Sequence, residues 1–429
     1  MKSPKVPEGK RVIDAAPEQP SGARLARVVV VLLAIAAGLG VALGFFTTGT
    51  LWCADHLQEL LWAKAEVALG WWAPLALCTA GGLCVGVATM RLGCTLDTLG
   101  QVVARCRAQG GYALPASVPK VLLLFLLPIA FGGAIGPEAG VSGLVVALAS
   151  RAVHAMRRSG VAAVRGADHP LAAALSVIAP GNSTPDARYA RVPGAVLWGA
   201  GGAGFVVGAR LFSLAFGPAG SLPRFDAIDY GTLDAATVGV SLAGVAVGCV
   251  LALFSAKSDA LLARVTTRPT DASPRRAVAQ AVLCGIALGT VACALPNVLF
   301  SGQVATRELA EGWREAGAGV LAATALAKLV LSNACVRTGW VGGQFFPLIF
   351  CGVSAGFALA AVAGVDLRLP VALTCAALVS GATGKWLLTT LVLALCFPPA
   401  SLPAVAASAF VAARVAAAAH AHAGRRQRA

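Results

Sequence analysis

The chain has 429 residues, of which 58 % are hydrophobic and only 12 % are charged, and its net charge is +15. Soluble domains carry about a quarter charged residues, so this chain has too little charge to coat a soluble globule, and its mean hydropathy of +0.78 indicates a lipid surrounding. Many of the basic residues lie at the chain ends and in connectors without interleaved aromatic residues, which argues against nucleic acid as a partner.

The first 26 residues are polar and contain four prolines, which predicts a disordered N-terminal segment. Such a long polar stretch before the first apolar run argues against a cleavable signal peptide. Residues 27–419 are predicted to form one transmembrane domain, and residues 420–429 a basic tail. Because both ends are basic, the positive-inside rule predicts a protein of the cell membrane with both termini in the cytoplasm.

Apolar runs along the body predict helices that cross the bilayer, since about 20 residues span its ~30 Å hydrocarbon core. Runs that approach or reach this length cover residues 28–46, 71–90, 196–216, 238–254, 277–300 and 345–365. Shorter runs cover residues 121–135, 141–150, 171–180, 371–379 and 386–397. The shorter runs predict half-helices, which are tolerated only where they are buried in protein or line a cavity. The predicted fold is therefore an all-α integral membrane bundle of tilted and broken helices.

Two glycine-rich breaks interrupt the apolar pattern, one in each half of the chain. Residues 132–140 read Gly-Gly-Ala-Ile-Gly-Pro-Glu-Ala-Gly, and residues 339–347 read Gly-Trp-Val-Gly-Gly-Gln-Phe-Phe-Pro. Paired breaks of this kind indicate a midplane binding site in transporters built from repeats. A helix that begins at a break directs free N–H groups at whatever lies in front of it. Two such N-termini facing one point predict an anion site without a cationic side chain.

Glu138 is the sharpest candidate in the first break. A carboxylate between apolar runs is costly in a membrane and indicates a function. Pro137 suits the first turn of a helix, so Glu138 is predicted at or just inside a helix N-terminus, where a permeant anion would also bind. If the side chain competes with the anion when ionised and swings away when protonated, it is a gate. The alternative is a cap for its own helix at a wet loop.

In the second break, the backbone N–H groups after Gly343 are predicted to face the pathway, with Phe345 and Phe346 shaping it. The alternative is a re-entrant turn that only eases helix packing. Lys328 and Lys385 also lie in apolar surroundings, where they could line an anion vestibule, snorkel or be paired.

At both breaks the chain resembles the CLC family of chloride channels and chloride/proton antiporters. Gly136-Pro137-Glu138-Ala139-Gly140 is similar to the family's G-x-E-x-P element, and Gly343-Gln344-Phe345-Phe346-Pro347 matches its G-x-F-x-P element. Lys120 and Lys328 resemble lysines that precede the two elements in many members, and Ser301-Gly302-Gln303 resembles a short turn of some bacterial members.

The resemblance covers most of residues 27–419 and carries several expectations. It implies an inverted repeat of tilted helices, a homodimer with one pore per subunit, and Glu138 as the gating glutamate. It also implies anion binding at Gly136, Pro137, Ala139, Gly343, Gln344, Phe345 and Phe346.

The chain departs from the family pattern at several places. Residues 91–99 read Arg-Leu-Gly-Cys-Thr-Leu-Asp-Thr-Leu where the family has its G-S-G-I-P element, and Gly140 replaces the proline of the first glutamate element. The candidates for the family's proton-relay helix, residues 171–180 and 196–216, end without an acid, and the family's late pore-lining tyrosine is absent. These departures favour passive conduction over proton exchange.

The predicted function is therefore passive transport of a small inorganic anion, chloride in the first place, across a lipid bilayer. The alternatives are a chloride/proton antiporter, transport of fluoride or nitrate, and a non-conducting membrane scaffold or sensor.

An enzyme, a cofactor and a metal site are not expected. Residues 199–204 fit the dinucleotide fingerprint G-x-G-x-x-G and residues 352–356 fit the G-x-S-x-G elbow, but both lie inside apolar runs and indicate helix packing. The twelve cysteines show no C-x-x-C spacing, and several lie within apolar runs as small hydrophobic residues.

Overall fold

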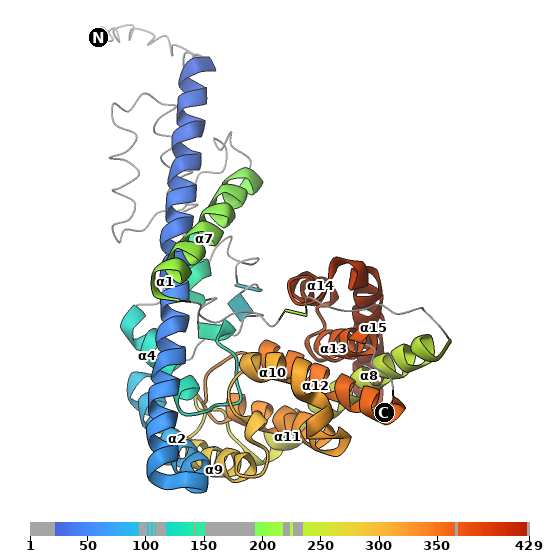
Figure 1. Cartoon of the computed structure of the whole chain (residues 1–429). Helices are drawn as coiled ribbons and strands as arrows, with labels where there is room; N and C mark the ends of the chain where they lie inside the picture. Colours follow the sequence, from blue (N-terminus) through green and yellow to red (C-terminus); the bar gives the residue numbers. More distant parts are fainter. Residues whose placement is uncertain are drawn as a thin grey trace, which may run out of the picture. The chain divides into compact units, whose positions relative to one another are not determined.

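The computed structural model describes residues 22–93, 101–102, 104–105, 108, 117–140, 143–150, 194–217, 224–225, 235–364 and 368–426. Every regular element within these residues is helical (Figure 1). The α-helices are α1 (Gly22–Leu69), α2 (Ala73–Leu92), α4 (Val118–Ala130), α7 (Gly194–Phe216), α8 (Ala235–Val265), α9 (Pro274–Ala292), α10 (Gln303–Ala316), α11 (Ala318–Arg337), α12 (Phe345–Ala363), α13 (Arg368–Thr383), α14 (Trp386–Leu393) and α15 (Leu402–Arg426). Short 3₁₀ turns are η1 (Gly70–Trp72), η3 (Pro296–Val298) and η4 (Pro399–Ser401).

Seven helical stretches of the described residues are long and apolar enough to cross a membrane. They are Val29–Leu92, Val196–Phe216, Ala235–Val265, Pro274–Ala292, Ala318–Arg337, Phe345–Ala363 and Pro399–Ala419. Shorter apolar helices, such as α4 and α13, fall below the crossing length, as the half-helix prediction requires. The predicted class, an all-α multi-pass membrane protein with broken helices, is confirmed.

The chain divides into two compact units. The first, Met1–Ala42 with Arg151–Gly208, contains in its described part the beginning of α1 and most of α7. Here the two helices approach through glycine, because a Cβ atom on Gly204 or Gly208 would collide with the main-chain carbonyls of Ala37 and Val41. The G-x-G-x-x-G pattern of residues 199–204 is therefore part of a helix contact, as the sequence predicts.

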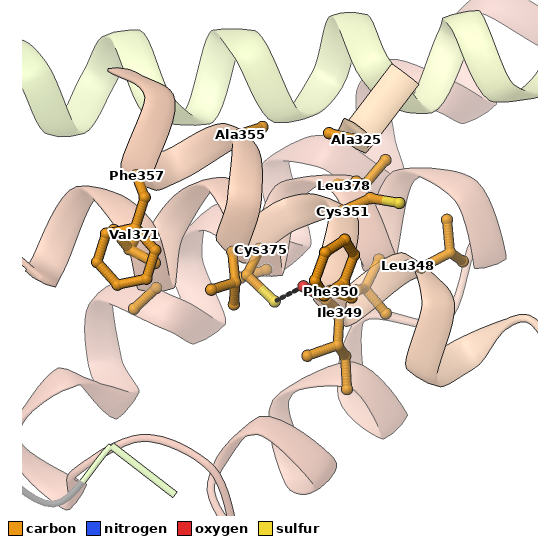
Figure 2. Close-up of a cluster of buried hydrophobic side chains, with 14 of the residues drawn as sticks. Ala325, Leu348, Ile349, Phe350, Cys351, Ala355, Phe357, Val371, Cys375 and Leu378 are labelled. Atoms are coloured by element: carbon orange, nitrogen blue, oxygen red, sulfur yellow. Dashed lines mark hydrogen bonds between the residues drawn. The ribbon is translucent and has the colours of Figure 1, made fainter. Parts of the chain in front are cut away.

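The second unit, Leu43–Ser150 with Ala209–Ala429, has α12 in its core. This helix packs against α13, α11, α10 and α8, and Figure 2 shows the buried side chains between α12 and α13. A Cβ atom on Gly352 would lie 2.6 Å from the Cα of Cys375, and one on Gly356 would lie 2.6 Å from the Cα of Val371. The G-x-S-x-G pattern of residues 352–356 thus permits close contact between two buried helices.

A second core in this unit forms where α2 packs along α9. Its centre is Trp340, which is fully buried and donates from Nε1 to the carbonyl of Ala281 at 3.1 Å. The same ring lies 3.0 Å from a Cβ atom built on Gly81 and 3.0 Å from one built on Gly133. This core includes Ala134 and Ile135 of the first break and Trp340 of the second, so both glycine-rich breaks pack against it.

The described helices differ from the predicted runs in four respects. Two crossing helices, α11 and α15, have no counterpart among the predicted runs, and the run predicted to reach residue 300 ends with α9 at Ala292 because Pro296 opens η3. The run at residues 28–46 is part of the much longer α1, and α15 continues to Arg426 through most of the expected tail. The short run at residues 171–180 lies outside the described residues.

Candidate anion site

The first break follows α4 directly. The helix ends at Ala130, and Gly132 then adopts a φ of +85°, which glycine reaches without strain. Trp62 packs against this glycine so closely that a Cβ atom there would lie 2.7 Å from its ring, and the Trp62 Nε1 donates to the Ala130 carbonyl at 2.9 Å. The chain becomes helical again at residues 138–140 and 143–150. Glu138 is therefore the first helical residue after the break, as predicted.

The second break repeats this arrangement. Helix α11 ends at Arg337, Gly339 has a φ of +96°, and α12 begins at Phe345. The N–H of Trp340 donates to the Cys335 carbonyl at 3.0 Å, which folds the chain back against the end of α11.

The two breaks pair with each other through their backbones. Gly136 N–H donates to the Gly343 carbonyl at 2.7 Å, and Gly343 N–H donates to the Gly136 carbonyl at 2.8 Å. The residues that play equal parts in the two breaks stand 207 positions apart, as Glu138 and Phe345 do. Equal spacing and reciprocal pairing are what a two-fold internal repeat produces.

The carboxylate of Glu138 lies at the N-terminus of α12. Its Oε1 accepts the N–H of Phe345 at 2.6 Å, while Oε2 is buried and has no hydrogen-bond partner within the described residues. A Cβ atom on Gly136 or Gly343 would collide with this carboxylate. The side chain therefore fills a space that only glycine leaves open, at a helix end that favours negative charge.

The other predicted site residues occupy different positions around this contact. The N–H groups of Gly136 and Gly343 are used by the pair itself, Pro137 has no N–H, and Ala139 is buried in the turn after Glu138. Phe345 and Phe346 are half-buried at the start of α12. Gln344 directs its amide to Asn333 of α11 at 2.6 Å. Sequence reasoning missed Asn333, although a lone amide in an apolar helix was a usable signal.

Lys328 of α11 binds the segment just before Phe300, which in turn contacts the first break. It is fully buried, and its Nζ donates to the carbonyls of Asn297 at 2.8 Å and Leu299 at 2.7 Å and lies 4.5 Å from the centre of the Phe350 ring. Phe300, which follows Leu299 in the chain, donates its N–H to the Gly132 carbonyl of the first break at 3.2 Å. Of the roles that the sequence left open for Lys328, the structure shows pairing with main-chain oxygens.

Lys120 is exposed at the start of α4, and the described residues contain no cluster of three or more potential metal ligands. Residues 94–100, which include most of the altered first anion-binding element, lie outside the described residues.

A family model for the voltage-gated chloride channel matches residues 189–417, more than half of the chain. The chain belongs to the voltage-gated chloride channel (CLC) family. The matched region includes the second break and α12, whereas Glu138 precedes it. The family consists of transporters and channels, and this protein is accordingly an anion-transporting membrane protein.

Solved CLC structures share the fold at low sequence identity. A CLC-type fluoride/proton antiporter is 19 % identical with a TM-score of 0.57, covering 92 % of this chain and 97 % of its own. A slow cyanobacterial Cl⁻/H⁺ antiporter is 14 % identical with a TM-score of 0.60, covering 90 % and 94 %. A eukaryotic CLC transporter is 16 % identical with a TM-score of 0.58, covering 91 % and 72 %. The search of curated proteins found no significant match.

Proposed function

We propose that this CLC protein conducts chloride passively and that Glu138 is its gate. The observation that carries the proposal is the hydrogen bond from the Phe345 N–H to Oε1 of Glu138 at 2.6 Å. At this position the carboxylate makes the contact that a permeant anion would make with the N-terminus of α12. An ionised Glu138 and an anion therefore compete for the same donor.

The proposed cycle needs only one side chain to move. When Glu138 is protonated, its carboxyl loses the charge that binds it to the helix end, and chloride replaces it at the Phe345 N–H. Phe345 and Phe346 border this position, and the Gly136–Gly343 backbone pair keeps the two breaks together while the side chain moves. We also propose a homodimer in the cell membrane, with one pore in each subunit and both termini in the cytoplasm.

Chloride efflux from liposomes that contain the purified protein tests this proposal. Wild type should release chloride faster as the pH falls, because protonation removes the competitor. Glu138→Gln and Glu138→Ala should conduct at all pH values, with efflux at neutral pH raised roughly tenfold or more, since a charged hydrogen bond of this kind is worth at least ~1.4 kcal/mol. Glu308→Gln, which neutralises an exposed acid of α10, is the matched control.

Other results would point elsewhere. Unchanged pH dependence in Glu138→Gln would leave Glu138 as a cap and not a gate. Flux of fluoride or nitrate without chloride would change the ion, and no flux of any of the three above empty liposomes would favour a scaffold or sensor.

A proton-coupled antiporter is the second candidate. It is favoured by the unpartnered Oε2 of Glu138, which is a position for a proton, and by the fold shared with proteins described as antiporters. Proton movement that accompanies chloride movement would distinguish it from passive conduction.

A further inference from the structure

Gln344 immediately precedes α12, and its side chain does not cap that helix. Instead its Nε2 donates to Oδ1 of Asn333 at 2.6 Å. Asn333 lies within α11 and is buried, with 4 % of its surface exposed. The residue next to the anion site is thus bound to a polar side chain inside the membrane domain.

Asn333 is bound in turn to α8. Its Nδ2 donates to the Ser258 hydroxyl at 2.7 Å and to the Ser255 carbonyl at 2.9 Å, and the Ser258 hydroxyl donates to the same carbonyl at 2.8 Å. A main-chain carbonyl can only accept, so it fixes which end of the Asn333 amide faces α8. The Oδ1 atom must then face Gln344, whose Nε2 supplies the matching donor.

These contacts form a chain of hydrogen bonds from α8 to Gln344, which is bonded in sequence to the site residue Phe345. It passes from Ser258 to Asn333 and Gln344, and the next backbone N–H after Gln344 is the one that binds Glu138. A buried amide without partners costs about 1–3 kcal/mol, so a polar chain in this apolar core persists only because each member satisfies another.

We infer that Asn333 is a positioning residue of the anion site: through Gln344 it fixes the N-terminus of α12 to α8, and so sets the affinity of the Phe345 N–H for the permeant anion and for Glu138. This inference rests on the proposed function, since it assigns a cause to the affinity of the same site. Among the described residues, the hydrogen bonds of Asn333 go to Ser255, Ser258 and Gln344 and not to Glu138.

A neighbouring ion pair provides a matched control. One turn along from Asn333, Arg337 binds Asp259 through two parallel hydrogen bonds of 2.5 Å. This pair joins α11 to α8, as Asn333 does, and among the described residues no hydrogen bond joins it to Gln344. Removing it tests the attachment of the two helices without breaking the chain of hydrogen bonds to the site.

The experiment measures initial chloride flux against chloride concentration in proteoliposomes at acidic pH, where Glu138 is protonated and does not compete, for wild type, Asn333→Ala, Gln344→Ala, Ser258→Ala and Asp259→Asn. Asn333→Ala and Gln344→Ala should raise the half-saturating concentration about fivefold to tenfold, the effect of losing roughly one interior hydrogen bond. The maximal rate should change less, and Ser258→Ala should give a smaller shift. The double variant should resemble either single variant, because both changes break the same chain of contacts.

A measurement that does not depend on transport accompanies the flux. Amide hydrogen exchange in detergent should increase at the first turn of α12 in Asn333→Ala and Gln344→Ala, and remain as in wild type in Asp259→Asn. Equal exchange and equal half-saturation in Asn333→Ala and wild type would overturn the inference. The same holds if Asp259→Asn reproduces the effect, because Asn333 would then act only in helix attachment. If wild type passes no anion but the exchange pattern is as expected, the proposed function fails and the positioning role stands.

Discussion

Only glycine fits at position 343, because a Cβ atom there would collide with the Glu138 carboxylate. We expect Gly343→Ala to displace that carboxylate from the α12 N-terminus. Chloride efflux at neutral pH should rise several-fold and its pH dependence should weaken, as in Glu138→Ala. In a Glu138→Ala background the same change should add little, because two changes that act on one contact are not additive.

Gly319→Ala is the matched control, since Gly319 lies in α11 with no atom within 4 Å of its built Cβ. It should leave efflux unchanged. If Gly343→Ala silences the protein even when Glu138 is also alanine, the backbone pair with Gly136 is what the substitution disrupts.

Lys328 carries a different prediction because its contacts are structural. Replacing it with methionine leaves the buried Leu299 carbonyl and the Asn297 carbonyl without their donor, which should cost about 1–3 kcal/mol of stability. The melting temperature in detergent should fall, while exposed Lys257→Met should not change it. A Lys328→Met variant that melts at or above wild type would mean that the buried ammonium destabilises the fold and is retained for its charge.

At this scale the sequence located Glu138 and both breaks, because a carboxylate and clustered glycines in apolar runs stand out by composition alone. It did not show that Gln344 binds Asn333 or that Lys328 binds two carbonyls. Those partners are separated by 11 and about 30 residues and meet only when helices pack. Side-chain direction at a helix terminus depends on that packing and has no local signature. The roles of the site residues therefore remain predictions.

Among the helices, the contact between α12 and α13 depends on small residues. The built Cβ of Gly352 lies 2.6 Å from the Cα of Cys375, which no side-chain rotation can relieve. Gly352→Ala should therefore force the helices apart and cost about 1–3 kcal/mol, seen as a lower melting temperature. Gly319→Ala, with free space in α11, should be neutral or stabilising, because alanine is the better helix former by up to ~1 kcal/mol. Equal melting temperatures would mean that α13 shifts without loss of packing.

The crossing helices show where apolar periodicity is sufficient and where it fails. Apolar runs predicted α2, α7 and α12 nearly where they lie, because length and hydropathy decide membrane insertion. Helix α8 was predicted too short, since it continues to Val265, well beyond residue 254 where its run ends. Helix α11 was not predicted because Lys328 and Asn333 interrupt its apolar run, and α15 was not predicted because it is rich in alanine and contains Arg414. Lys328 and Asn333 are both buried against hydrogen-bond partners, which is the context that a sequence window does not contain.

For the whole molecule, the repeat relates the site to the fold. Corresponding residues of the two breaks are separated by 207 positions, and the two breaks meet as one backbone pair. The family model reaches from residue 189 to residue 417 and so covers the second break alone. The first break is connected to the matched region by contacts, because Glu138 and Gly136 bind residues inside that region.

Transport mode is also a property of the whole molecule, since coupled exchange requires side chains that carry a proton through the protein as well as a path for the anion. Within the described residues, Glu138 is the one acidic side chain with a buried, unpartnered carboxylate oxygen, and α7 contains no Asp or Glu. We therefore expect that a tenfold chloride gradient moves no protons against their own gradient in proteoliposomes whose membrane potential is clamped. A pH-sensitive dye in weakly buffered medium measures this, and a proton ionophore added at the end verifies that the vesicles respond. Uphill proton movement in wild type that disappears in Glu138→Ala would make the protein an antiporter, with Glu138 carrying both the gate and the proton.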